Sequence, residues 1–248
     1  MPTLRRRMLN IFTQVTGLNV SRKGEGCRLL ELETLARFLS EFRVDCVFDV
    51  GANNGQYGLR LRQIGFRGLI VSFEPNPAAF AKLLVTAQAN PKWITKQIAL
   101  DSEPRTLMFN VMKRDQFSSL HEPDHSKTDA FAQLNVVEKQ VQVATETLDS
   151  LYPELQDKFG FSRPFLKLDT QGHDPHIVAG ANNCLRNFAG LQGELSLTPI
   201  YKNTNSFTEA LALYNSRGFK LTALVPNNSG HFPDLTEIDC VMYNPEFR

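Results

Sequence analysis

Short apolar runs alternate along the chain with longer stretches in which apolar residues recur every three or four positions. A short apolar run bounded by turn residues is typical of a strand buried on both faces, and the longer pattern is typical of a helix that packs by one side. Seven runs predict strands, the last of them antiparallel: 46–50, 69–74, 93–100, 165–169, 191–197, 219–225 and 237–243. This order predicts an α/β fold, with a mostly parallel sheet that helices cover on both faces.

Helical spacing separates most of these runs. It predicts helices at 28–42, about 57–64, 77–89, 175–187 and 206–216. Between the third and fourth runs, two further stretches alternate in polarity as half-buried strands do: 105–111 and 141–147. The polar stretch between them, 112–140, is expected to be a surface loop or a lid over a cleft.

The first predicted strand leads into a loop that is rich in Asn and Gly. Asp49 stands near the end of the strand, and Gly51, Asn53 and Gly55 follow before the next helix begins. Glycine lets a ligand approach the backbone closely, and the first turn of a helix offers unpaired N–H groups. Glu74 ends the second strand, where an acid about 20 residues past the glycine loop holds the two hydroxyls of a ribose. The two motifs together predict a nucleoside cofactor.

What the loop lacks narrows the choice of cofactor. A dinucleotide fingerprint that starts at Gly51 requires glycines where the chain has Asn53 and Gln56, and no phosphate-binding Gly-Lys-Ser/Thr motif follows. A nucleoside without a phosphate remains, and S-adenosylmethionine is the commonest such cofactor with this kind of loop. The end of the first strand and the loop backbone would face its amino-acid end, and the backbone of Ala99 and Leu100 would border the adenine.

The fourth predicted strand repeats the layout of apolar run, acid, turn and helix, with Asp169 at its end. Ligands in open α/β sheets bind beyond the carboxyl ends of the strands. We therefore expect Asp49, Glu74 and Asp169 to stand along one edge of the sheet. Lys167 lies between apolar residues of the same strand, so it requires a carboxylate partner.

Length and charge restrict the class of protein more than its chemistry. The chain has 248 residues, enough for one α/β domain, and its 27 Lys and Arg nearly balance its 26 Asp and Glu. This balance argues against a nucleic-acid partner. The four cysteines form no Cys-x-x-Cys pair, and Cys46 and Cys240 lie in apolar runs, so we expect reduced core residues in a cytoplasmic protein.

The polar stretch holds two histidines four residues apart, His121 and His125. This spacing can ligate a metal on a helix, but Pro123 stands between them and argues against a helix. No metal site is therefore predicted.

The first residues resemble a signal peptide only superficially. Three arginines at 5–7 precede a moderately apolar stretch, but polar residues interrupt it and no small-residue cleavage site follows. Residues 1–43 are expected to form a helical segment packed on the core of a domain at 44–248 or on a second copy in a homo-oligomer. A weak membrane-surface helix is the alternative, and no apolar segment is long enough to span a bilayer. The apolar face of this segment is made by Leu4, Met8, Ile11, Phe12 and Val15.

Seven phrases, spread in order over the chain, match one known family. They are Val47–Tyr57, Ser72–Pro75, Ala99–Leu100, Ser118–Leu120, Thr147–Asp149, Phe165–Asp174 and Glu194–Ser196. Together they resemble the FkbM family of S-adenosylmethionine-dependent methyltransferases over roughly residues 44–243. The resemblance implies the class I methyltransferase fold, a Rossmann-like sheet of seven strands with one antiparallel strand near its edge. It also implies methyl transfer to a hydroxyl of a sugar or of a macrolide-type natural product.

The resemblance implies roles for individual residues. It places on the cofactor Asp49, Gly51, Asn53, Gly55 and Glu74, with Ala99 and Leu100 near the adenine. Asp169 and Glu194 then lie at strand ends that face the transferred methyl group. Our hypothesis is that one of them takes the acceptor's proton or orients its hydroxyl, with His173 as an alternative base. The histidine departs from the family, in which this position is often aromatic or small.

The acceptor is not determined by the sequence. The resemblance favours a hydroxyl of a surface glycan or of its nucleotide- or lipid-linked precursor, with a polyketide or other secondary metabolite as the second choice. The stretch 112–140 and the loop after Pro199 are expected to shape its pocket. Whether a divalent ion bridges Asp169 and the acceptor stays open. The alternatives are an oxidoreductase that uses a nicotinamide dinucleotide, and a binding protein that keeps the fold without catalysis.

Overall fold

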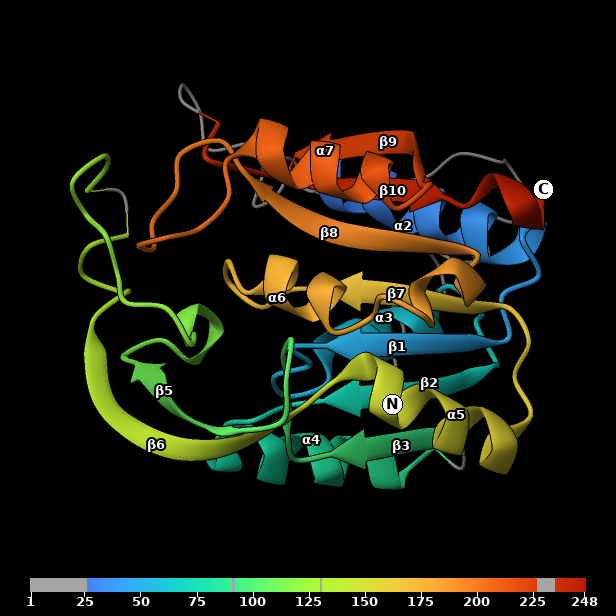
Figure 1. Ribbon diagram of the computed structural model, residues 1–248, viewed down its shortest axis with the longest axis horizontal. Coiled ribbons are helices and arrows are strands. Elements are labelled where there is room, and N and C mark those ends of the chain that lie inside the picture. Colours follow the sequence, from blue (N-terminus) through green and yellow to red (C-terminus); the bar gives the residue numbers. More distant parts are fainter. Residues whose placement is uncertain (1–25, 91, 130, 227–234) are drawn as a thin grey trace, which may run out of the picture.

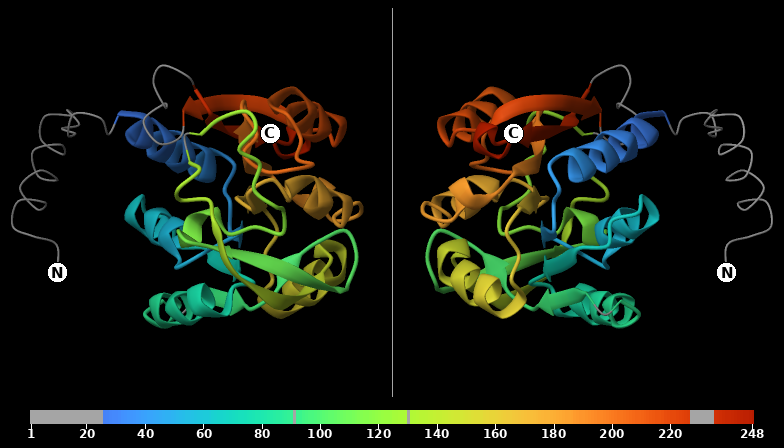
Figure 2. Two further views of the ribbon diagram at one scale, coloured as in Figure 1. Left: turned by 90° about the vertical axis from the view of Figure 1, so that its left-hand side faces the viewer. Right: turned by 90° about the vertical axis from the view of Figure 1, so that its right-hand side faces the viewer.

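The computed structural model describes residues 26–90, 92–129, 131–226 and 235–248. Its helices are α2 (Gly26–Glu41), α3 (Gln56–Gln63), α4 (Pro77–Gln88), α5 (Leu148–Phe159), α6 (Asp174–Ala179) and α7 (Phe207–Ser216). They lie on both sides of a central sheet (Figure 1). Figure 2 shows α2, α3 and α4 on one face and α5, α6 and α7 on the other. The predicted α/β fold with helices on both faces is confirmed.

The central sheet has the strand order β3-β2-β1-β7-β8-β10-β9. The strands are β1 (Cys46–Val50), β2 (Leu69–Phe73), β3 (Trp93–Lys96), β7 (Pro164–Leu168), β8 (Gly190–Ser196), β9 (Lys220–Pro226) and β10 (Glu237–Tyr243). Neighbours are parallel except around β10, which is antiparallel to both β8 and β9. This is the predicted class I methyltransferase sheet, and its antiparallel strand lies one place in from the edge.

β1 lies at the centre of this sheet and is buried along its whole length. Its side chains alternate between two cores, as the two-residue period of a strand requires. Val47 packs with Leu35 of α2 on one face, and Phe48 packs with Leu151 of α5 on the other. The Phe48 ring contacts four other rings: Phe73, Tyr152, Phe161 and Phe188. Burial on both faces fixes β1 and, with it, the start of the loop that follows.

A second sheet stands at the end toward which the parallel strands point (Figure 1). It consists of β4 (Ala99–Leu100), β6 (Val137–Glu146) and β5 (Thr106–Met112), in that order. The prediction of a single strand at 93–100 is wrong, because β3 ends at Lys96 and β4 pairs in parallel with β6 instead. This change of sheet carries Ala99 and Leu100 away from the outer strand of the main sheet and toward its carboxyl edge.

Two helices differ from the predicted ones. α5 is absent from the predictions, although its buried residues recur at helical spacing and Thr147 caps its first turn; these residues are Leu148, Leu151, Tyr152 and Leu155. The helix predicted at 175–187 is shorter, because α6 ends at Ala179 and a separate 3₁₀ turn follows at Leu185–Asn187.

α2 is the described part of the N-terminal segment predicted for residues 1–43. Its Leu35, Phe38 and Leu39 are buried against the core. The apolar face predicted for the first residues lies outside the described part of the chain, and so does the subunit contact that was based on it. Among the described residues, no helix has the length and apolar character that crossing a bilayer requires.

Candidate functional site

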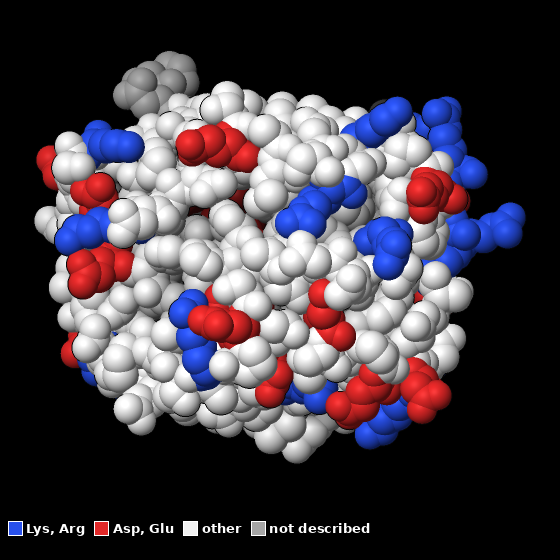
Figure 3. Space-filling model, viewed as in Figure 1, with Lys and Arg blue, Asp and Glu red and all other residues white. Residues whose placement is uncertain are grey.

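A cavity of about 240 Å³ opens at the carboxyl ends of the parallel strands. Its lining includes the loop after β1, the acid that follows β2 and the acid that follows β7: Gly51–Asn53, Glu74 and Asp169. Asp49 and Asp169 both act to raise the pKa of Glu74 by their charge, after burial, so the three acids lie near one another. They share one edge of the sheet, as predicted. On the face shown in Figure 3, acidic side chains lie within a hollow, and basic and acidic groups are otherwise interspersed.

The loop after β1 has a backbone that favours glycine. Gly51, Asn53 and Gly55 have φ values of 77°, 48° and 85°, all in the left-handed region. A Cβ atom on Gly51 would lie 1.9 Å from the carbonyl oxygen of Asp169, so a side chain is excluded where the loops after β1 and β7 meet. The Asn53 side chain accepts a hydrogen bond from the backbone N–H of Asn54, at 2.8 Å. The loop is therefore a fixed cradle that ends at the first turn of α3.

Glu74 links this loop to the end of β2. One carboxylate oxygen accepts a hydrogen bond from the backbone N–H of Asn53 at 2.7 Å, and the other accepts one from Asn76 at 2.8 Å. Burial raises the pKa of Glu74 to about 7. Each carboxylate oxygen has further lone pairs, so the group can accept hydrogen bonds from two ribose hydroxyls as well. Its place on the cavity wall fits the predicted ribose contact, whereas the contact itself stays a prediction.

Asp49 lies beneath the loop and has no exposed surface. Its Oδ2 accepts a hydrogen bond from the Ser72 hydroxyl at 3.1 Å, and its Oδ1 has no hydrogen-bond partner among the described residues. Burial raises its pKa. A direct contact with a ligand would require the loop to shift, so in this geometry Asp49 can influence a bound cation only through its charge. The charge of Asp49, with its unpartnered Oδ1, would nevertheless attract a cationic amino-acid end that lay above this loop. Gly51 has no side chain that would block this position.

The opposite end of the cavity is apolar and lies against the second sheet. Ala99 and Leu100 line it, as expected for the adenine end of a nucleoside. The other apolar residues here are Ile98, Phe109 and Leu120. Leu120 belongs to the polar stretch 112–140, so that stretch does contribute to the cleft.

Asp169 and Glu194, the two candidate bases, are bridged by one side chain. The amide Nε2 of Gln171 donates to Asp169 Oδ1 at 3.2 Å and to Glu194 Oε2 at 3.0 Å. The other end of this amide, Oε1, accepts from the Tyr201 hydroxyl at 3.0 Å. Gln171 has a φ of 53°, which a non-glycine residue rarely adopts, so its surroundings hold it in place. Gln171 belongs to the Phe165–Asp174 motif, which by itself indicates no role for this residue.

The two carboxylates have opposite pKa shifts. Although burial acts to raise it, the pKa of Asp169 is lowered because Lys167 Nζ lies 2.7 Å from its Oδ2. This is the partner that Lys167 was predicted to require. Burial and then the charge of Glu237 raise the pKa of Glu194 well above its ordinary value.

Beyond Glu194 the cavity has a wall of polar side chains that the sequence analysis missed. It is made by Glu31, Tyr57, Gln192, Glu237 and Asp239. Burial raises the pKa of Glu237 to about 7 and that of Asp239 to about 8. A signal was present in the sequence, because polar residues alternate at 192, 194 and 196 and again at 237 and 239. Such alternation in strands of a covered sheet indicates a face that lines a cavity.

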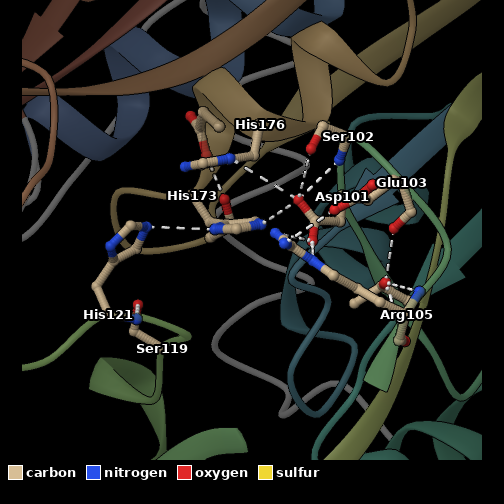
Figure 4. A network of polar contacts seen from close by, with 11 residues as sticks. Asp101, Ser102, Glu103, Arg105, Ser119, His121, His173 and His176 are labelled. Carbon is tan, nitrogen blue, oxygen red and sulfur yellow. Dashed lines mark hydrogen bonds and ion pairs between the residues drawn. The ribbon is translucent and has the colours of Figure 1, made fainter. Parts of the chain in front are cut away.

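His173, the alternative base, lies at the N-cap of α6 and lines the same cavity. Its Nε2 lies 3.2 Å from Asp101 Oδ1, and its Nδ1 lies 3.2 Å from His121 Nε2 (Figure 4). Burial and then the charge of His176 lower its pKa to about 4. Both ring nitrogens are therefore engaged with other side chains. The histidine pair considered in the sequence is not formed, since His125 Nε2 contacts the carbonyl oxygen of Asn135 instead.

The chain is similar to several solved structures of methyltransferases. The chain is 14% identical to the methyltransferase FkbM of Methylobacillus flagellatus KT, with a TM-score of 0.49 over 81% of this chain and 44% of that one. Magnesium protoporphyrin IX methyltransferase from Synechocystis PCC 6803, solved with its methyl donor, is 10% identical, with a TM-score of 0.48 over 95% and 90%. Aeropyrum pernix fibrillarin, also solved with S-adenosylmethionine, is 12% identical, with a TM-score of 0.44 over 80% and 66%. This chain thus spans less than half the length of the Methylobacillus protein.

None of the curated proteins compared with the chain matches it. The family comparison is decisive, because the FkbM methyltransferase domain matches residues 49–221, which is more than half of the chain. The match includes the glycine loop, Glu74, Asp169 and Glu194. The chain therefore belongs to the FkbM family of S-adenosylmethionine-dependent methyltransferases.

Proposed function

We propose that this protein transfers the methyl group of S-adenosylmethionine to a hydroxyl of a polyhydroxylated acceptor, a sugar or glycan. The observation that carries the proposal is the pair of carboxylates, Asp169 and Glu194, joined by the amide of Gln171 inside the cavity. The polar wall beyond them supports a sugar, because carboxylate and amide oxygens accept hydrogen bonds from hydroxyls. A polyketide-type metabolite with several hydroxyls is the second choice of the same class.

The proposal sets the cofactor between the loop after β1 and the apolar residues beside the second sheet. The residues that would hold it are Glu74 at the ribose, the backbone of Gly51, Asn53 and Gly55 at the amino-acid end, and Ala99 and Leu100 at the adenine. Asp49 would favour the cationic end through its charge. When bound, S-adenosylmethionine supplies a methyl group that its sulfonium already activates. The protein's task is then to align the acceptor and to receive a proton, and alignment alone is worth about 7 kcal/mol or more.

Glu194 suits the role of base better than Asp169 does. Two acids whose surroundings push their pKa values apart commonly divide the work of an active site. In its ionised form, Glu194 is a stronger base than an ordinary carboxylate because its pKa is raised, so it can accept the hydroxyl proton as the new carbon–oxygen bond forms and the carbon–sulfur bond breaks. Asp169 remains ionised beside Lys167 and can orient the hydroxyl by accepting a hydrogen bond. His173 is the less suitable base because Asp101 and His121 occupy both of its nitrogens.

An amine acceptor is the second candidate. The cavity is lined by more acids than bases, with Arg60 and Lys167 as the basic residues in its lining. A cationic amine would be attracted to such a wall, although its nitrogen would have to lose a proton before it could attack the methyl group. The hydroxyl is preferred because burial raises the pKa of Glu237 to about 7 and that of Asp239 to about 8, so these two acids carry less than full charge near neutral pH.

The test uses S-adenosylmethionine with a labelled methyl group and matched panels of acceptors. One panel holds monosaccharides, nucleotide-linked sugars and glycans, and the other holds amines of similar size. We expect label to enter a hydroxylated acceptor, with equal formation of S-adenosylhomocysteine, and we expect both signals to fall in Glu194→Gln. Transfer to amines alone would reject the hydroxyl proposal.

A further inference from the structure

Three histidines from separate parts of the chain meet beside the cleft. His121 comes from the stretch between β5 and β6, and His173 and His176 come from the start of α6 (Figure 4). Each has one ring nitrogen that lies within 4.8 Å of a ring nitrogen of the other two. The spacing in the sequence pairs His121 with His125 instead. The signal for His176 is that it stands three residues after His173, where two side chains share one face of a helix.

The hydrogen bonds around the cluster determine which nitrogens carry protons. His173 Nε2 faces the carboxylate of Asp101, which is fully buried and also paired with Arg105 at 2.8 Å. A carboxylate accepts hydrogen bonds, so His173 has its proton on Nε2 and a lone pair on Nδ1.

His121 faces this lone pair. Its Nε2 lies 3.2 Å from His173 Nδ1. In the tautomer that carries its proton on Nδ1, His121 presents a second lone pair on Nε2, and two lone pairs that face each other at this distance can bind one cation between them.

The spacing suits a metal ion. Two nitrogens that bind one tetrahedral zinc ion at roughly 2.0–2.1 Å lie about 3.3 Å apart, close to the distance seen here. We propose that His121, His173 and His176 form a site for a divalent transition-metal ion, with zinc the best match for three imidazoles and one open position. In such sites the other ring nitrogen of a histidine ligand commonly donates a hydrogen bond to a carboxylate, which holds the ring in place. Asp101 is this carboxylate for His173.

One ring has to move for the site to close. The rings of His173 and His176 are stacked, with 9° between their planes and 4.5 Å between their centroids. Two parallel rings cannot both point at one ion, so the His176 ring turns on binding. Its Nδ1 lies 3.9 Å from Asp101 Oδ1, and its side chain is 45% exposed, so the ring has room to rotate.

The ion would join the stretch 112–140 to the core. His121 is the ligand from that stretch, and Leu120 beside it lines the apolar end of the cleft. Ser119 already ties the same stretch to the turn after β7, because its hydroxyl donates to the carbonyl oxygen of Gln171 at 2.9 Å. Metal binding would therefore hold this segment over the cleft without requiring the ion to take part in methyl transfer.

The test uses the full chain without a histidine tag, stripped with EDTA and titrated with ZnCl2, CoCl2 and MgCl2. We expect one Zn²⁺ or Co²⁺ per chain, visible Co²⁺ absorption bands typical of nitrogen ligands, and a rise in Tm that EDTA reverses. Mg²⁺ should not compete, because it requires oxygen ligands. His176→Ala and His121→Ala should each weaken Zn²⁺ binding at least about 10-fold, and Asp101→Asn should weaken it by about 10- to 100-fold.

The matched control is His125→Ala, which removes a histidine of the same stretch that lies outside the cluster. It should bind Zn²⁺ as the parent chain does. The proposal is overturned if no Zn²⁺ or Co²⁺ binds, if Mg²⁺ competes equally, or if His121→Ala and His176→Ala keep the parent affinity. Circular dichroism of each variant separates lost binding from lost folding. His176→Ala is the most useful variant in this respect, because the His176 side chain is half-exposed and the fold depends on it least. None of these measurements depends on methyl transfer, so failure here leaves the proposed function untouched.

Discussion

The two ends of the cleft, to which we assign the cofactor and the acceptor, are built in different ways. At the proposed cofactor end, the lining comes from one short loop, Gly51–Asn53, and from the acid that follows the neighbouring strand, Glu74. At the proposed acceptor end, the groups are side chains of α2, β7, β8 and β10, brought together only by folding. The first kind of site is local in sequence and constrained by backbone geometry. The second kind depends on strand register, so its chemistry can change without any change in the loop.

The first prediction has the largest expected effect, and it concerns catalysis rather than cofactor binding. Glu194→Gln removes the proposed base, and general-base catalysis is worth about 10²- to 10⁴-fold, so kcat should fall by that factor. The Kd of S-adenosylmethionine should stay near that of the parent chain. The raised pKa of Glu194 implies that the parent's kcat/KM increases as the pH rises through it, because the ionised form is the base. This rise should be absent in the variant.

The control for this variant is Glu122→Gln, which makes the same chemical change in an exposed acid paired with Lys202 at 2.9 Å. It should keep the parent's rate and pH profile. Full turnover by Glu194→Gln would reject the assignment, and a large loss in Asp169→Asn with none in Glu194→Gln would transfer the role to Asp169.

The second prediction concerns the cofactor end. Glu74→Ala removes the acceptor for the backbone N–H groups of Asn53 and Asn76 and for the ribose hydroxyls. Hydrogen bonds to a charged group contribute about 1.5–3 kcal/mol each, so two lost ribose contacts weaken S-adenosylmethionine by about 100-fold or more. Calorimetry measures this Kd directly. Unchanged affinity would show that the ribose does not contact Glu74.

The same comparison explains what the sequence could predict. The glycine loop and the acids at the strand ends follow from contiguous patterns, and so do the seven strands of the main sheet. The change of sheet at Ala99 could not be predicted, because it depends on the edge that β6 offers more than 40 residues later. α5, by contrast, does carry a helical apolar period, from Leu148 to Leu155, and could have been predicted in spite of Pro153. The length of α6 is set by the turn at Gly180.

The wall of polar side chains beyond Glu194 shows why the site could be predicted only in part. Glu194 and Asp239 are directly opposite each other in the β8–β10 ladder, a pairing of two acids that no local pattern reveals. What the sequence does contain is the alternation of polar positions on both strands, and register turns this alternation into one acidic face. Likewise, His121 gains its partners only when the stretch that carries it folds over α6.

The third prediction tests the ion pair that supports the acceptor end. Asp169→Asn leaves the Lys167 ammonium, which is 8% exposed, without its 2.7 Å partner. Breaking a fully buried pair costs roughly 3–5 kcal/mol, and about 2 kcal/mol is expected here because the Asp169 side chain is 42% exposed. Urea unfolding should therefore show a lower midpoint. A midpoint equal to the parent's would mean that solvent or another acid stabilises Lys167.

The pH dependence of this stability has a defined sign. The folded-state pKa of Asp169 lies below its unfolded value, so its contribution is present above the unfolded pKa. It is lost as the pH falls through the folded pKa. The difference in stability between parent and Asp169→Asn should accordingly shrink in acid, and a difference that grows in acid would contradict the pairing.

The smallest expected effect lies where the two ends meet. The Tyr57 hydroxyl, on α3, donates to Gln192 Oε1 at 2.8 Å, and Gln192 Nε2 donates to Glu31 at 3.3 Å. Tyr57→Phe removes only this hydroxyl and should cost about 1 kcal/mol of stability. The aromatic ring that lies 5.2 Å from Lys167 Nζ is kept, whereas Tyr57→Leu removes it as well.

If the acceptor end works independently of the cofactor end, Tyr57→Phe should raise the KM for the acceptor a few-fold and leave the Kd of S-adenosylmethionine unchanged. Tyr57→Leu should add a loss of stability to the same rise in KM, because Lys167 then loses a contact. An equal change in cofactor affinity and acceptor KM would mean that α3 transmits strain from the acceptor wall to the glycine loop, since Tyr57 stands two residues beyond Gly55. The two ends would then behave as one site, and the acceptor could not vary independently of the loop.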